Sequence, residues 1–122
     1  MANILIVDDS RTSRKIIKKI LEDAVHTVIA EAKDCEDGYL KYKELKPELV
    51  TLDITMPKMD GLEALQLIKK SDDHVKAIMI TAAGQKEKMI QAIKYGAAEF
   101  ISKPYEPDEV KEVVDKVLND QQ

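Results

Sequence analysis

The chain is poor in the residues that build disulfide frameworks, long loops and membrane spans. Its 122 residues include one cysteine, four glycines, four prolines and no tryptophan. The single cysteine, Cys35, excludes an internal disulfide and is typical of a reducing compartment. The longest apolar runs, such as Ile4–Val7, have about four residues, too few to cross a bilayer. No basic segment followed by an apolar stretch marks a secretory signal. These absences predict a cytoplasmic protein without membrane insertion.

The chain also lacks an excess of positive charge. Charged residues make up 34% of it, hydrophobic residues 44%, and the formal net charge is −4. A negative balance argues against direct binding of nucleic acid, whose phosphates attract Lys and Arg. The length suffices for one hydrophobic core. We therefore expect residues 1–122 to form a single globular domain.

Short apolar runs alternate with segments of helical periodicity. The expected strands are Asn3–Val7, His26–Glu31, Leu49–Leu52, Ala77–Ile80 and Glu99–Ile101. Three of the expected helices are Cys35–Leu45, Leu62–Lys70 and Lys86–Tyr95. The first helix is expected after Ser10, with an apolar face of Ile16, Ile17, Ile20, Leu21 and Ala24, and the last has a stripe of Val110, Val113, Val114, Val117 and Leu118. Such alternation predicts an α/β domain of three layers, in which helices cover both faces of a parallel sheet. Gly38 interrupts the second helix, and we expect it where this helix approaches the sheet.

Polar side chains stand at the ends of four expected strands. Asp8 and Asp9 follow the first, Asp53 the third, Thr81 the fourth, and Lys103 comes soon after the fifth. In open parallel sheets, functional residues gather at the carboxyl ends of the strands. Taken singly, an aspartate pair is often a helix cap, a threonine a turn residue and a lysine a surface residue. Their joint occurrence at one edge favours a functional site.

The chemistry of this set favours a divalent cation and a phosphoryl group. Carboxylates in close proximity repel one another unless a cation neutralises them. Mg²⁺ prefers oxygen ligands and combines one or two carboxylates with phosphate oxygens; Mn²⁺ is expected to substitute. A carboxylate such as Asp53 can accept a phosphoryl group, and Lys103 can stabilise the charge during transfer.

Four motifs together carry a family resemblance. I-L-I-V-D-D-S, L-D-I-T-M-P-K-M-D-G, M-I-T-A and I-S-K-P-Y occur in order along the chain. They resemble the motifs of response-regulator receiver domains of two-component signalling, and are most similar to the stand-alone, chemotaxis-regulator-like kind. The resemblance implies a flavodoxin-like (βα)₅ sandwich with a five-stranded parallel sheet in the order 2-1-3-4-5.

The resemblance also assigns roles to residues of this chain. Asp53 would be the phosphoryl acceptor, charged by a histidine kinase. Asp8, Asp9, Asp53 and the backbone carbonyl of Thr55 would form the Mg²⁺ site. Lys103 would pair with the acceptor, and the Lys103–Pro104 peptide bond would be cis. Thr81 would bind the phosphoryl group, and Phe100 would turn inward in response. Thr55 and Ala83 would tune dephosphorylation.

Signal output is implied on the face of helix 86–95, strand 99–101 and the last helix. Lys88, Gln91, Lys94, Tyr95 and Tyr105 are plausible contributors there, although each could equally be an ordinary solvated residue. The downstream partner would be a motor switch, a phosphatase or a phosphotransfer protein. Such a protein is no enzyme beyond its own Mg²⁺-dependent phosphorylation and slow dephosphorylation.

Other functions stay open at this point. A phosphorelay intermediate would pass its phosphoryl group on to a histidine phosphotransfer domain. An aspartyl-nucleophile phosphatase is a remote alternative, because neither Asp8 nor Asp53 begins the D-x-D motif of that class. A nucleotide-binding loop would need glycines after the first strand, where Ser10 and Arg11 stand.

The remaining polar residues have simpler interpretations. His26 and His74 stand apart from the carboxylates, so we expect neither to bind a metal. The basic run from Arg11 to Lys19 is interpreted as the solvated face of a helix. Cys35 is expected to be a buried or half-buried structural thiol, and Asp34 a loop or helix-start carboxylate.

Overall fold

The computed structural model describes residues 2–54, 60–82 and 84–119. The strands are β1 (Asn3–Val7), β2 (Thr27–Ala32), β3 (Leu49–Asp53), β4 (Ala77–Thr81) and β5 (Glu99–Ser102). The helices are α1 (Arg11–Asp23), α2 (Cys35–Leu45), α3 (Gly61–Ser71), α4 (Lys86–Lys94) and α5 (Pro107–Asn119). Each expected element is present, and where bounds were predicted the ends differ by at most one residue.

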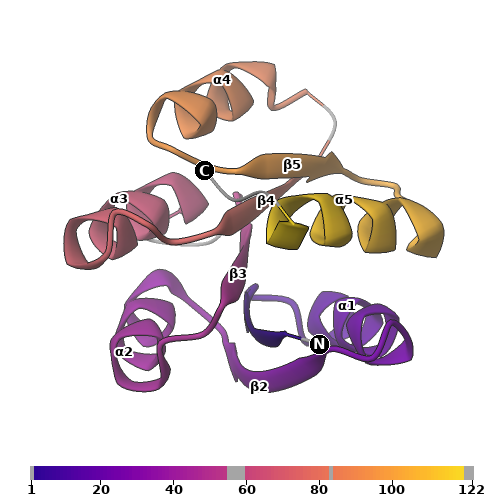
Figure 1. Ribbon diagram of the computed structural model, residues 1–122. Helices are drawn as coiled ribbons and strands as arrows, with labels where there is room; N and C mark the ends of the chain where they lie inside the picture. The colour runs from indigo at the N-terminus through magenta and orange to yellow at the C-terminus, as the bar shows by residue number, and fades with distance from the viewer. Residues whose placement is uncertain (1, 55–59, 83, 120–122) are drawn as a thin grey trace.

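The five strands form one parallel sheet in the order β2-β1-β3-β4-β5. Helices α1 and α5 lie together on one face, and α2, α3 and α4 cover the other (Figure 1). This arrangement confirms the predicted three-layer fold. Because the strands are parallel, their carboxyl ends meet at one edge of the sheet, and their amino ends meet at the opposite edge.

The sheet separates two apolar clusters. Leu5, Leu52 and Met79 point toward α2, α3 and α4, while Ile6, Ile78 and Ile80 point toward α1 and α5. Every residue of β3 and β4 is buried, as expected for strands covered on both faces. This double burial makes the central strands a rigid support for the residues at their ends.

The expected apolar face of α1 needs one correction. Ile17, Ile20 and Leu21 are buried, but the side chain of Ile16 is 50% exposed. Residues 17, 20 and 21 form a stripe at helical spacing, and residue 16 lies about 100° around the helix from residue 17. The apolar stripe of α1 that packs on the sheet is therefore narrower than the set of apolar residues in the sequence indicates.

Gly38 permits the close approach of α2 to β1. A Cβ atom at this position would lie 2.8 Å from Cγ2 of Val7. The prediction that the glycine sits where the helix approaches the sheet is confirmed. Its contact is with Val7, the last residue of β1, so α2 packs directly beside the carboxyl edge.

Side-chain caps mark the starts of α1 and α2. The Ser13 amide donates a hydrogen bond to Ser10 Oγ (3.2 Å), and the Asp37 amide donates one to Asp34 Oδ1 (2.8 Å). Both caps satisfy amides that the helix itself cannot pair. The interpretations of Ser10 and Asp34 as helix-start residues are confirmed.

Cys35 begins α2 and is completely buried. Burial, followed by nearby carboxylates, raises the pKa of its thiol to about 11. The expected burial of this thiol is confirmed. None of the helices in the described ranges has the length and apolar character of a membrane span.

Candidate functional site

The carboxyl edge of the sheet brings the predicted site residues together. Asp8 follows β1 directly, Asp53 is the last residue of β3, and Thr81 is the last residue of β4. Lys103 comes immediately after β5, which ends at Ser102. Because β1, β3, β4 and β5 are neighbours in this order, residues far apart in the chain share one edge.

Three carboxylates form a cluster at this edge. Oxygen atoms of Asp8, Asp9 and Asp53 all lie within 4.8 Å of one another. Asp8 and Asp53 are buried, whereas Asp9 is exposed. A set of hard oxygen donors with one open side suits Mg²⁺, which keeps several of its waters. The donor set therefore fits the ion that the sequence predicts.

The charge of this cluster is costly without a cation. Burial raises the pKa of Asp8, and the negative charge of Asp9 adds to that effect. A hydrogen bond from the Ser10 amide (2.8 Å), the positive charge of Lys103 and a hydrogen bond with Asp53 act in the opposite direction. The net rise shows that these partners do not fully compensate the buried charge.

Lys103 is held close to Thr81 by the backbone. The Lys103 amide donates a hydrogen bond to the Thr81 carbonyl at 2.8 Å. The Lys103–Pro104 peptide bond is cis, as the family resemblance implies. The influence of Lys103 on the pKa of Asp8 shows that its charge acts on the carboxylate cluster.

Thr81 is completely buried at the end of β4. Its hydroxyl donates a hydrogen bond to the carbonyl of the next residue, Ala82, at 3.1 Å. Such a local bond leaves the oxygen lone pairs available and can be exchanged for another acceptor. The side chain therefore has a replaceable partner rather than a permanent structural one.

Gly61, the first residue of α3, packs tightly against the end of β3. The Gly61 amide donates to the Ile54 carbonyl at 2.9 Å, and a Cβ at Gly61 would lie 2.3 Å from the carbonyl oxygen of Asp53. Asp60 caps α3 through the amides of Leu62 and Glu63. Only glycine allows this close approach to the backbone of Asp53.

Two of the predicted site residues lie outside the described residues. Thr55, assigned to the metal site through its carbonyl and to dephosphorylation through its side chain, is one of them. Ala83, the other tuning position, is the second. Their roles stay predictions.

Phe100 is half-buried on β5 and packs against the cluster on the α2, α3 and α4 side. Its predicted role as a switch residue stays a prediction.

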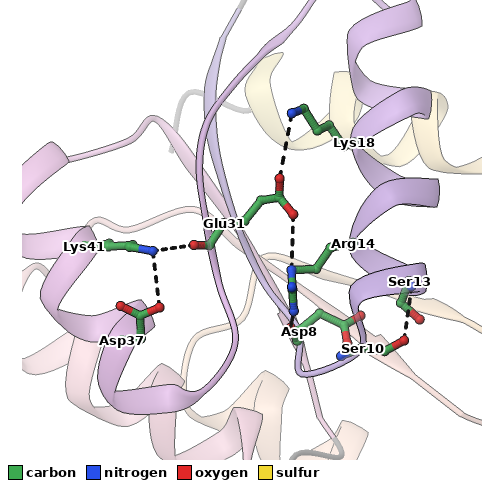
Figure 2. Close-up of polar contacts among 8 residues, drawn as sticks. All are labelled: Asp8, Ser10, Ser13, Arg14, Lys18, Glu31, Asp37 and Lys41. Atoms are coloured by element: carbon green, nitrogen blue, oxygen red, sulfur yellow. Dashed lines mark hydrogen bonds and ion pairs between the residues drawn. The ribbon is translucent and has the colours of Figure 1, made fainter.

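Two residues near the site have roles that the sequence did not predict. Arg14 belongs to the basic run interpreted as a solvated face, yet its side chain is only 16% exposed and its Nη1 donates to the Asp8 carbonyl at 2.7 Å (Figure 2). Tyr105, expected on the output surface, is half-buried, and burial, Asp8 and Asp53 all raise the pKa of its hydroxyl. Both depend on tertiary packing, which no sequence motif encodes.

Comparison with known proteins identifies the family. The sequence profile of the response regulator receiver domain matches residues 4–115. The chain belongs to this family. Chemotaxis protein CheY of Listeria monocytogenes is 48% identical over 116 residues, which cover 95% of this chain and 98% of that protein. CheY of Thermotoga maritima is 46% identical over 114 residues, covering 93% and 95%.

Solved structures agree with the receiver assignment. The CheX–CheY–BeF₃–Mg²⁺ complex from Borrelia burgdorferi has a TM-score of 0.92 and 38% identity, covering 97% of this chain and 90% of that one. The receiver domain of NtrX from Brucella abortus has a TM-score of 0.89 and 34% identity, covering 94% and 97%. This receiver domain is thus CheY-like in sequence and fold, and two-component signalling is its functional context.

Proposed function

We propose that this receiver domain is a response regulator that a histidine kinase activates by phosphorylating Asp53. The observation that carries the proposal is the position of Asp53. It is a buried carboxylate at the end of a rigid central strand, clustered with Asp8 and Asp9, and Lys103 follows the end of β5 at the same edge.

The proposed reaction transfers a phosphoryl group from a histidine nitrogen to a carboxylate oxygen. A carboxylate oxygen of Asp53 attacks the phosphorus of a phosphohistidine on the kinase. The P–N bond breaks, an acyl phosphate forms, and the released imidazole takes up a proton. Because phosphoryl transfer depends mainly on positioning and electrostatics, the fixed end of β3 and the charge of Lys103 are the protein's main contributions.

The carboxylates would hold Mg²⁺ through Asp8, Asp9 and Asp53. When bound, Mg²⁺ supplies positive charge that offsets the phosphoryl oxygens. Mn²⁺ also prefers oxygen donors and is expected to replace it. Lys103 provides a further positive charge at the same edge.

The switch is proposed to begin at Thr81. A phosphoryl group brings strong acceptor oxygens, and the Thr81 hydroxyl would leave Ala82 to donate to one of them. The movement of Thr81 would open space for the ring of Phe100, which is half-buried at present. The chemical event at Asp53 would thus become a change of packing at β5.

The output surface is proposed on α4, β5 and α5. Ile90 and Ile93 on α4 are 47% and 55% exposed, and Tyr95, directly after this helix, is 42% exposed. Exposed apolar residues in such proximity suit a protein partner. Lys88 also pairs with Asp60 at 3.3 Å, which connects this helix to the start of α3. Gln91 and Lys94 are exposed on the same helix and remain candidates.

Several further properties follow from the proposal. The downstream partner is a protein such as a motor switch, a phosphatase or a phosphotransfer protein, and the domain has no catalytic role beyond its own phosphorylation and dephosphorylation. The cytoplasm is the proposed location, and a free, buried cysteine suits its reducing conditions. Thr55 and Ala83 are proposed to set the lifetime of the phosphorylated state.

The proposal can be tested with beryllofluoride, a stable mimic of a phosphoryl group. Phe100 is the only phenylalanine of the chain, so its ring gives an unambiguous NMR signal. Beryllofluoride with Mg²⁺ should shift the signals of Thr81 and Phe100 in the wild type and in Asp72→Asn, a control at the opposite edge of the sheet.

In Asp53→Asn the same additions should leave both signals unchanged. Equal shifts in this variant would contradict the role of Asp53. If radiolabelled phosphate moved onward from the phosphorylated protein to a histidine of a partner, a phosphorelay role would replace that of a terminal output protein.

A further inference from the structure

A groove rich in positive charge lies between α1, β2 and α2, beside the carboxylate site (Figure 2). It has a volume of about 570 Å³. We call it the basic groove and define it by its six cationic residues: Arg11, Arg14, Lys15, Lys18, Lys33 and Lys41. Two acidic residues, Glu31 and Asp37, complete its lining.

The basic groove reverses the charge balance of the chain. Six cationic and two acidic residues leave it with a formal excess of four positive charges, whereas the whole chain carries −4. The remaining surface is correspondingly more acidic. Such a separation of charge directs an anionic partner to one place on the molecule.

Glu31 shows how the basic groove holds a carboxylate. One of its oxygens accepts from Arg14 Nε at 3.1 Å, and the other lies 3.8 Å from Lys18 Nζ. Its backbone carbonyl accepts from Lys41 Nζ at 2.6 Å (Figure 2). An acidic group thus already sits at the centre of the groove with cations around it.

Other cations of the basic groove have no such partner. Arg11, Lys15 and Lys33 are exposed, and within the described part of the chain none of them forms an ion pair or side-chain hydrogen bond. By contrast, Arg14 is committed to Glu31 and to the carbonyl of Asp8. The groove therefore combines a fixed interior with a rim of available positive charge.

The lining indicates which anion the basic groove suits. None of its described lining residues is aromatic or glycine, so bases would find no ring to stack on and phosphates no glycine-rich cradle. Long polyanions would also meet the acidic remainder of the surface. Carboxylates of a short acidic peptide segment avoid both difficulties.

We propose that the basic groove is a docking surface for an acidic segment of a partner protein, held by Arg11, Lys15, Lys18 and Lys33. This surface is separate from the proposed output face on α4, β5 and α5. Arg14 is a positioning residue in it, because it joins Glu31 to the backbone of Asp8. The partner would thus dock beside the phosphoryl-acceptor edge.

The proposal can be tested with a fluorescent oligoglutamate peptide and the whole chain, by fluorescence anisotropy. The peptide should bind at about 50 mM salt and be released at about 300 mM, because exposed charges are screened. The double variant Lys15→Gln/Lys33→Gln should weaken binding about fivefold, since each exposed charge pair contributes modestly. The control Lys70→Gln/Lys86→Gln removes the same charge from exposed positions on α3 and α4 and should leave affinity nearly unchanged.

Glu31→Gln offers a test in the opposite direction. It removes the internal competitor for Arg14 and Lys18 and should tighten binding of the peptide by a few fold. The proposal would be overturned by a peptide that does not bind at low salt, by equal losses in the two double variants, or by weaker binding to Glu31→Gln. Equal or tighter binding of a single-stranded oligonucleotide of the same charge would also overturn it.

Discussion

The two edges of the sheet differ in whether their polar groups have compensating partners. At the carboxyl edge, Asp8, Asp9 and Asp53 bring three like charges within 4.8 Å. At the amino edge, hydrogen-bond donors pair with acceptors. The Ala2 amide donates to His26 Nδ1 at 3.2 Å, and the Tyr42 hydroxyl donates to Asp72 Oδ2 at 2.9 Å.

Opposite pKa shifts follow from this difference. At the carboxyl edge, burial raises the pKa of Asp8. At the amino edge, hydrogen bonds from the His74 amide and the Tyr42 hydroxyl lower the pKa of Asp72. The carboxyl edge therefore carries negative charge that its neighbours do not fully compensate, whereas the polar groups of the amino edge stabilise one another.

A cavity alone does not mark function in this molecule. The amino edge contains one of about 490 Å³, lined in part by His26, Tyr42 and Asp115. Most of its polar groups bind one another, although His26 Nε2 has no hydrogen bond within the described residues and lies 3.9 Å from Asp115 Oδ1. The uncompensated charge, rather than a cavity, distinguishes the carboxyl edge.

The largest effect on stability is expected from a side chain at position 61, which packs against the backbone of Asp53. Gly61→Ala would place a Cβ atom 2.3 Å from the Asp53 carbonyl oxygen and 2.9 Å from the Ile54 Cα, so the backbone must move. We expect the free energy of unfolding to fall by about 3 kcal/mol, measured by urea denaturation.

Gly38→Ala is the matched control for that substitution. The three atoms nearest to its Cβ would all belong to the side chain of Val7. The gain in helix propensity of about 1 kcal/mol offsets part of this clash. An equal loss of stability in both variants would contradict the importance of the backbone contact at Gly61.

An intermediate effect should appear in the pH dependence of stability without divalent cations. The folded pKa of Asp8 is raised above 3.8, so its favourable contribution exists below that pH and is lost as the pH rises through the folded pKa. Asp72 has a folded pKa below 3.8, so its contribution exists above that pH and is lost as the pH falls through the folded pKa.

Urea unfolding in EDTA between about pH 3 and pH 7 measures both contributions. Relative to Asp8→Asn, the wild type should lose stability as the pH rises. Relative to Asp72→Asn, it should gain stability over the same range. If the stability of the wild type changed in the same direction with pH relative to both variants, the two edges would not be electrostatically opposed.

The smallest effect is expected at the amino edge. Tyr42→Phe removes the hydrogen bond to Asp72 and should lower the free energy of unfolding by about 1 kcal/mol. Beryllofluoride binding at the carboxyl edge should be unaffected. A loss of that binding at unchanged stability would mean that the two edges are coupled.

Much of the fold and site could be predicted because they depend on local patterns. Apolar strands and helical stripes placed Asp8, Asp53, Thr81 and Lys103 at strand ends, and parallel pairing brings such ends together. The exact limits of strands were less accessible: Asp53 belongs to β3 itself, since its backbone continues the ladder.

Features that depend on packing between elements could not be predicted. Ile16 is apolar yet 50% exposed, because the direction in which α1 packs decides which residues of its face are covered. Arg14 belongs to a run of basic residues that is typical of a solvated helix face, and only the fold brings its side chain to the Asp8 carbonyl. Tyr105 likewise acquires its proximity to the carboxylates from the chain path after β5.

The most direct test of the central claim is chemical phosphorylation of Asp53. Acetyl phosphate and Mg²⁺ should add a phosphoryl group to the wild type and to Asp72→Asn, detected by intact mass. The adduct should be absent from Asp53→Asn, whose folding is checked by its unfolding transition. Undiminished phosphorylation of folded Asp53→Asn would contradict the account.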